Sequence, residues 1–91
     1  MKKLVLHTVL GLSWFEQDDK PHMRVRVLEL EEKHNDLLTL LKDAILTKEN
    51  LCLTVAEFTV IARIRSVTYD VFKGDITIVA RIEESMDDAS T

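Results

Sequence analysis

The residue types that most often do chemistry are few in this chain, and their spacing fits no known site. His7, His22 and His34 form no metal-ligand pattern such as HxxxH, and Cys52 is the only cysteine. Two glycines cannot make a phosphate-binding loop, and no GxSxG or Cys–His arrangement marks a nucleophile. None of the 16 acidic residues is singled out by its spacing as a general acid or base. We therefore expect a protein that is not an enzyme and that uses no metal or cofactor.

Arginine is the residue type whose placement suggests a function. Every arginine falls in a predicted strand, where the alternation of residue types directs it away from the apolar side. The planar guanidinium group binds carboxylates and phosphates through paired hydrogen bonds, and arginine is enriched at protein interfaces. We expect a sheet face that recognises an acidic partner; the simpler interpretation is a solvated face with charge pairs between strands. The residues are Arg24, Arg26, Arg63, Arg65 and Arg81.

The segment SWFEQDD is a second candidate surface, which we predict to be a polar loop. It places Trp14 and Phe15 beside Asp18 and Asp19. An aromatic anchor with an acidic rim is a common design for a small interaction site. Two alternatives remain at this point: both rings fold under as a lid on the core, or capping-box spacing produces a single helical turn at the rings.

The elements that position these residues follow from hydrophobic periodicity. Residues 3–12 read as one strand and residues 23–27 as another. Leucines at helical spacing predict a helix over residues 35–48 that begins at Asn35 as its N-cap. Residues 54–65 are compatible with a strand or a helix, and their many β-branched side chains favour the strand.

A near-repeat predicts the last hairpin. TVIARI at residues 59–64 returns as TIVARI at 77–82, and a two-residue turn at 73–74 would place the two segments in one antiparallel ladder. One extra residue near Arg65 keeps the apolar side chains of both strands on one face. The pairs expected on that face are Tyr69 with Ile78, Val67 with Ala80, and Ile64 with Ile82. We interpret the repeat as two partners in a ladder and not as a duplication.

Together these elements predict an α+β domain over residues 1–83. Its four-stranded antiparallel sheet (β-β-α-β-β, with a C-terminal β-hairpin) would carry one helix on one face and leave the other face bare. Residues 84–91 are acidic and predict a flexible tail. The net charge of −4 equals the four acids from Glu83 onward, so the body of the domain is neutral.

We expect a cytoplasmic protein. The start MKKLVLHTVL resembles a secretion signal, but His7 and Thr8 interrupt its apolar run and no small-residue cleavage site follows. The sequence also contains no apolar stretch of about 18 residues that could cross a membrane.

These features together predict a small protein-binding module with a protein partner. Self-assembly is part of this hypothesis, because an acidic loop and an arginine face could meet in neighbouring copies as a homodimer or larger oligomer. Size and character are typical of accessory proteins of phages or mobile elements, some of which inhibit host proteins. The alternative is a single-stranded nucleic-acid-binding protein, which the neutral body disfavours and for which only Phe72 is placed to stack on a base.

Overall fold

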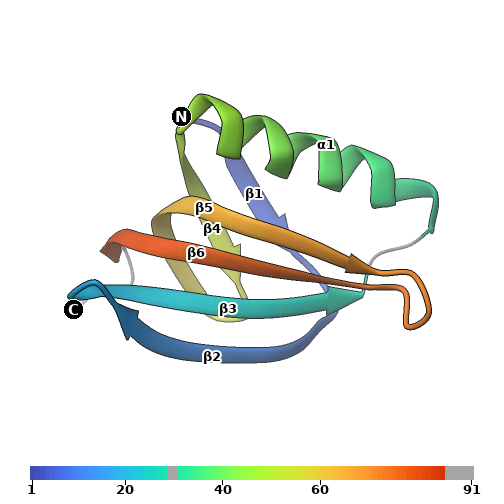
Figure 1. The fold of residues 1–91 in the computed structure, drawn as a ribbon, viewed down its shortest axis with the longest axis horizontal. Helices are drawn as coiled ribbons and strands as arrows, with labels where there is room; N and C mark the ends of the chain where they lie inside the picture. Colours follow the sequence, from blue (N-terminus) through green and yellow to red (C-terminus); the bar gives the residue numbers. More distant parts are fainter. Residues whose placement is uncertain (29–30, 86–91) are drawn as a thin grey trace.

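The computed structural model describes residues 1–28 and 31–85, and of residues 31–34 only the backbone. The described part forms one mixed sheet and one helix (Figure 1). The elements in chain order are β1 (Lys3–Leu6), β2 (Val9–Gln17), β3 (Lys20–Leu28), α1 (Glu31–Thr47), β4 (Asn50–Val55), β5 (Phe58–Asp70) and β6 (Asp75–Ser85). Glu84 and Ser85, expected in the tail, belong to β6, and the rest of that tail, residues 86–91, lies outside the described residues.

The sheet has six strands in the order β1-β4-β5-β6-β3-β2, so the expected four-stranded antiparallel sheet is wrong. β1 runs parallel to β4, and the other neighbouring pairs are antiparallel. The predicted strand over residues 3–12 is in fact two strands, which break at Thr8 with a φ of 52°. β1 lies at one edge of the sheet and β2 at the other. The break therefore gives the sheet one strand more than predicted, and it also creates the parallel pairing of β1 with β4.

The predicted loop SWFEQDD is also a strand for most of its length. β2 continues through Trp14 and Phe15 to Gln17 and pairs with β3 over this whole stretch. The chain turns only at Asp18 and Asp19, whose φ angles of 55° and 61° are both left-handed. A two-residue hairpin turn requires this conformation at both positions, and aspartate tolerates it better than most residues.

Residues 54–65 are strand, as favoured from their β-branched side chains, but they belong to two strands. β4 and β5 meet in a tight turn at Ala56 and Glu57, and the φ of Ala56 is 54°. Neither glycine, proline nor asparagine marks this turn, and the β-branched pattern continues on both sides of it. The sequence therefore offers no signal for the turn.

The C-terminal hairpin is present with a longer turn than predicted. The Asp70 carboxylate accepts hydrogen bonds from the backbone N–H groups of Phe72 (2.9 Å) and Lys73 (3.1 Å), which organises a four-residue turn over residues 71–74. Gly74 closes it with a φ of 74°. The predicted register is therefore wrong by two residues. The observed pairs are Tyr69 with Ile76, Val67 with Ile78, and Ile64 with Ala80.

Because a shift of two residues keeps each side chain on its face, the predicted faces of this ladder survive the register error. The extra residue expected near Arg65 is confirmed as an irregularity between Ile64 and Ser66. A second one, between Ile61 and Ala62, was not foreseen.

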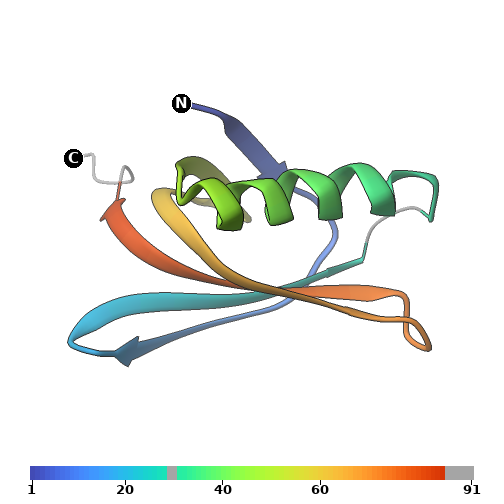
Figure 2. The same ribbon diagram turned by 45° about the horizontal axis from the view of Figure 1, so that its top comes forward.

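The helix packs on one face of the sheet and encloses the core. It begins at Glu31 and not at the predicted Asn35. Figure 2 shows α1 lying along one side of the strands, and no described element lies across the opposite side. We call these the inner and the outer face. The buried core consists of Leu37, Leu41 and Ala44 from the helix and Leu6, Met23, Val25, Val27, Leu51, Leu53, Val55, Val60, Ala62, Ile64, Ile76, Ile78 and Ala80 from the sheet.

The strands twist strongly, so that β1 and β4 run steeply across the direction of β2 and β3 (Figure 1). This twist brings the edge strand β2 towards the β4–β5 hairpin on the inner face. Trp14 of β2 meets Phe58 of β5 edge to face there, with 5.5 Å between ring centroids. The aromatic pair thus extends the core beyond the area that the helix covers.

The end of the helix carries a non-glycine residue in the left-handed conformation. Lys48 has a φ of 59°, its N–H donates to the Ile45 carbonyl (3.3 Å), and the Glu49 N–H donates to the Ala44 carbonyl (3.3 Å). These two bonds form the Schellman arrangement, in which glycine is the preferred residue at the left-handed position.

We expect Lys48→Gly to raise the free energy of unfolding by about 1 kcal/mol, because glycine adopts this conformation without the steric cost of a Cβ. Urea unfolding followed by circular dichroism measures the change. Lys42→Gly, inside the same helix, is the control and should lower stability by about 1 kcal/mol. A loss of stability in Lys48→Gly would contradict the described helix end.

Candidate functional site

Four arginines lie on the outer face, in adjacent strands. Arg63 of β5 is directly opposite Arg81 of β6, and Arg81 is in turn opposite His22 of β3. Arg24 and Arg26 follow along β3, on the same face as His22. The alternation places all four opposite the core side chains, as predicted. We call Arg24, Arg26, Arg63 and Arg81 the outer arginine cluster.

Arg65 is the arginine that does not join this cluster. It is the extra residue at the irregularity between Ile64 and Ser66, so it has no partner in the ladder of β6. It lies instead near the end of the helix, where it lines a small hollow together with Lys48 and Arg63. The prediction of five arginines on one face therefore describes four of them.

Two members of the cluster pair with carboxylates. Arg26 lies 3.6 Å (Nε to Oδ2) from Asp75, whose side chain is only 8% exposed. Arg81 forms a hydrogen-bonded salt bridge with Glu83. Within residues 1–28 and 35–85, neither Arg24 nor Arg63 forms an ion pair.

Arg24 is held by aromatic contacts. Its guanidinium carbon lies 5.3 Å from the centroid of the Phe15 ring, and Phe15 stacks on His22 at 5.2 Å. His22 is buried and donates a hydrogen bond from Nδ1 to the Lys20 carbonyl (2.9 Å). This chain of contacts fixes the position of a guanidinium group that has no acidic partner in the described part of the chain.

Arg63 is the least satisfied member of the cluster. Its Nε is buried and has no hydrogen-bond acceptor among the described residues. Asn50, its neighbour on β4, has a buried Oδ1 that likewise finds no donor there. Leaving a buried polar atom unpaired costs about 1–3 kcal/mol, and the like charge of Arg81 directly opposite adds to this cost. Such groups in native proteins call for an explanation.

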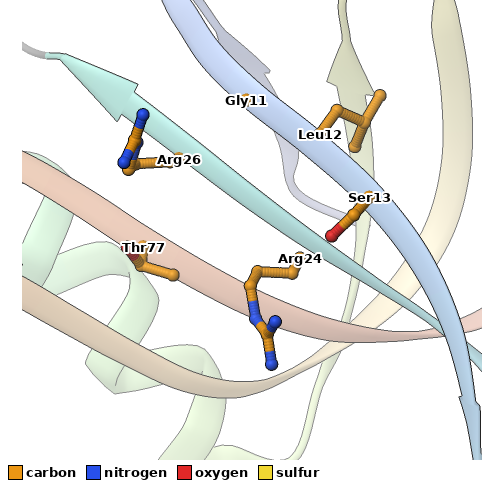
Figure 3. A pocket seen from close by; sticks show the side chains of 6 residues that line it. All are labelled: Gly11, Leu12, Ser13, Arg24, Arg26 and Thr77. Carbon is orange, nitrogen blue, oxygen red and sulfur yellow. The ribbon is translucent and has the colours of Figure 1, made fainter.

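A hollow of about 360 Å³ lies on the outer face between residues 11–13 of β2 and the two arginines of β3 (Figure 3). Thr77 of β6 lies beside Arg26, the guanidinium groups of Arg24 and Arg26 point away from each other, and Gly11 leaves its side of the hollow without a side chain. A Cβ at Gly11 would meet no atom within 4 Å. The lining residues are Gly11, Leu12, Ser13, Arg24, Arg26 and Thr77.

The electrostatic effect of the cluster is visible at Glu83. The hydrogen bond from Arg81 lowers the pKa of the Glu83 carboxyl below its ordinary value of 4.5, against the opposing effect of desolvation, and the charges of Arg81, Arg63 and Lys20 lower it further. Arginines of the outer face therefore stabilise the ionised form of a carboxylate that lies among them.

A lowered pKa means that Glu83 stabilises the fold above its unfolded-state pKa and that this contribution disappears as the pH falls through the folded-state pKa. We expect Glu83→Gln to be less stable than the natural chain at pH 7, and the difference to vanish as the pH is lowered from 4.5. Urea midpoints of both proteins between pH 7 and acid measure this. A difference that persists unchanged in acid would show that the carboxylate charge has no part in it.

The residues of the predicted Trp-Phe acidic loop are not brought together. Trp14 and Phe15 are neighbours in a strand, so they point to opposite faces: Trp14 to the inner face beside Phe58, and Phe15 to the outer face beside Arg24. Asp18 and Asp19 are exposed in the turn at the end of the hairpin.

Sequence reasoning missed several residues of the outer face. His22 stacks on Phe15, Asp75 pairs with Arg26, and Asn50 faces Arg63. Extending the alternation of β3 backward by one residue past Met23 would have placed His22 beside the arginines. The contribution of Asn50 depends on the β4–β5 pairing, for which the sequence offers no signal.

The described residues contain neither a cluster of metal-ligand side chains nor a helix that could span a membrane. No three histidine, cysteine, aspartate or glutamate side chains among them lie close enough to hold a metal ion. No helix in this part of the chain is long and apolar enough to span a membrane. The chain matches no protein-family model, no curated protein and no solved structure at a significant level.

Proposed function

We propose that this protein is a small non-enzymatic binding module that recognises an acidic segment of a protein partner through the outer arginine cluster. The observation that carries the proposal is the pair Arg63 and Arg81, two arginines directly opposite each other in the ladder on the uncovered face. The buried Nε of Arg63 has no acceptor in the described part of the chain. A carboxylate placed between these two arginines would accept hydrogen bonds from their guanidinium groups and relieve the repulsion.

The second unpaired arginine supports the same kind of partner. Arg24 is held over the Phe15 ring, so its guanidinium loses less side-chain freedom when it binds a carboxylate. Arg24 and Arg63 lie on β3 and β5, with β6 between them. An acidic segment that crosses β6 would reach both of them, which favours a partner with several carboxylates over a single small anion.

A single-stranded nucleic acid is the alternative, and one observation favours it. Phe15 and His22 lie on the outer face beside Arg24, and aromatic rings next to arginines are the usual platform for unpaired bases. Both rings already contact each other, and Arg24 already lies over Phe15. Since a base would have to displace one of these contacts, we favour the acidic protein.

The biological setting that fits such a module is an accessory role in the cytoplasm. A chain of 91 residues with one exposed positive face can occupy the acidic surface of a larger protein and block it. The lone half-buried thiol of Cys52 fits a reducing compartment. A phage or mobile-element protein that inhibits a host protein would work in this way.

Affinity capture with matched variants tests the proposal. The tagged natural chain, the double variant Arg24→Glu/Arg63→Glu and the control Lys42→Glu, whose exposed side chain lies on the helix, are incubated with lysate of the native host. We expect a protein that is retained by the natural chain and the control and lost with the double variant. Circular dichroism must show that all three are folded. Equal retention by the double variant would refute the arginine cluster as the binding surface.

A mobility-shift assay separates the nucleic-acid alternative. Single-stranded oligonucleotides at low salt should leave the mobility of the protein unchanged if the partner is an acidic protein. A shift that weakens steeply with salt and is lost in the double variant would instead assign the cluster to a nucleic acid.

A further inference from the structure

The two edges of the sheet are built differently. β1 closes one edge with only four residues, and Lys2 and Lys3 lie at its start. Short strands and lysines are common ways to prevent an edge from pairing with another chain. β2 closes the other edge with nine residues and carries no charged residue before Glu16. In the described part of the chain, β2 pairs with β3 alone. The backbone groups on the edge of β2 that points away from β3 are therefore free to pair with another strand.

The free edge also exposes apolar side chains. Leu10 is exposed at an irregularity between Val9 and Gly11, and Trp14 is 48% exposed although it contacts Phe58. Exposed tryptophan at an unpaired strand is typical of an interface, because the ring buries a large area when it is covered.

The hollow at Gly11 indicates what covers this edge. Gly11 is the position on β2 where a side chain is missing from the outer face, and nothing in the structure requires a glycine there, since a Cβ would meet no atom. Its φ is not left-handed either. In paired strands, an aromatic side chain opposite a glycine covers the exposed backbone and stabilises the pair.

We propose that two copies of this chain pair antiparallel through β2, with Ser13 on the two-fold axis. This register places Phe15 of each copy opposite Gly11 of the other on the outer face, where the hollow receives the ring. It places Trp14 of each copy opposite Leu12 of the other on the inner face. A symmetric pair of this kind uses the same strand in both copies, which is the commonest form of a homodimer.

The surroundings of the paired strands agree with this register. The pairing covers Gly11 to Phe15, which lies between the irregularity at Leu10 and the end of the hairpin. The acidic turns at Asp18 and Asp19 then lie at opposite ends of the ladder, so that they do not repel each other. The two sheets become one, and the two outer arginine clusters form a continuous surface. The dimer does not depend on the proposed acidic partner, because the free edge carries it alone.

The oligomeric state of the natural chain tests the dimer. Light scattering and sedimentation are measured from about 1 µM to about 1 mM, because a five-residue ladder buries little area and should bind weakly. We expect the mass to rise from that of the 10.5 kDa monomer to twice that value. The fluorescence of Trp14, the only tryptophan, should shift to shorter wavelength in parallel as the ring is covered.

Two substitutions distinguish this pairing from other contacts. Gly11→Val fits the monomer, since the position is open and valine favours strands, but it fills the place of the second copy's Phe15. We expect Gly11→Val to weaken dimerisation at least tenfold without loss of thermal stability at low concentration.

Ser13 provides the more specific test because it lies opposite itself on the axis. Ser13 is exposed, so Ser13→Lys and Ser13→Glu should both fold, and each alone should be monomeric through repulsion of like charges. An equimolar mixture should restore the dimer as a mixed pair. A natural chain that stays monomeric to about 1 mM, or variants that dimerise like the natural chain, would overturn the proposal. Loss of partner capture in Arg24→Glu/Arg63→Glu would leave it unaffected.

Discussion

Ile78→Ala is expected to lower the free energy of unfolding by about 3–4 kcal/mol. Ile78 is fully buried at the centre of β6, between Val25 of β3 and Val67 of β5. Removing three carbon atoms there leaves a cavity that three tightly packed strands cannot close. The free-energy cost of this cavity adds to the hydrophobic free energy that is lost with the buried carbon atoms. A domain of this size has about 5–15 kcal/mol of stability in total, so the variant should be only marginally folded.

Urea unfolding followed by circular dichroism measures this effect, with Val79→Ala as the matched control. Val79 is the next residue of the same strand, and it faces the partly exposed outer side. We expect the control to cost less than about 1 kcal/mol. Equal losses in the two variants would mean that the inner and outer faces of β6 are assigned incorrectly.

Leu41→Ala should cost about 3 kcal/mol, because this side chain fixes the helix to the sheet. Leu41 is fully buried, and together with Leu37 and Ala44 it forms the apolar stripe of α1. Helical propensity does not confuse the comparison, since alanine and leucine are both good helix formers. The loss would therefore measure the packing of the helix on the inner face.

Leu46→Ala is the control on the same helix, because its side chain is 81% exposed. It should change the free energy of unfolding by less than about 0.5 kcal/mol. If Leu46→Ala were the more damaging substitution, α1 would present the opposite face to the sheet, and the outer face would not be the uncovered one.

How far the sequence predicted the fold depended on how local each signal was. The faces of β3, β5 and β6 followed from alternation, and the hairpin register error of two residues did not disturb them. The number of strands could not be predicted, because the breaks at Thr8 and Ala56 carry residues with left-handed φ angles that the sequence does not announce. Which strands become neighbours is a property of the whole sheet, so the parallel pairing of β1 with β4 was out of reach.

The candidate site was predictable to the same extent. Four arginines could be assigned to one face because each lies in an alternating strand. Arg65 was misplaced because it occupies the very irregularity that the alternation required. The aromatic contact of Phe15 with Arg24 was missed because Trp14 and Phe15 were assigned to a loop. The polar residues that follow them are typical of a loop, but pairing with β3 holds both residues in a strand.

Arg63→Glu tests the central claim, the outer arginine cluster as a recognition surface, most directly. Glutamate opposite Arg81 replaces a like-charged pair by an attractive one but also loses the attraction between Arg63 and Glu83, so we expect the free energy of unfolding to change by less than about 1 kcal/mol. The affinity for the captured partner, measured by calorimetry, should nevertheless fall at least about tenfold. A variant that is as stable as the natural chain and binds the partner with unchanged affinity would contradict the account.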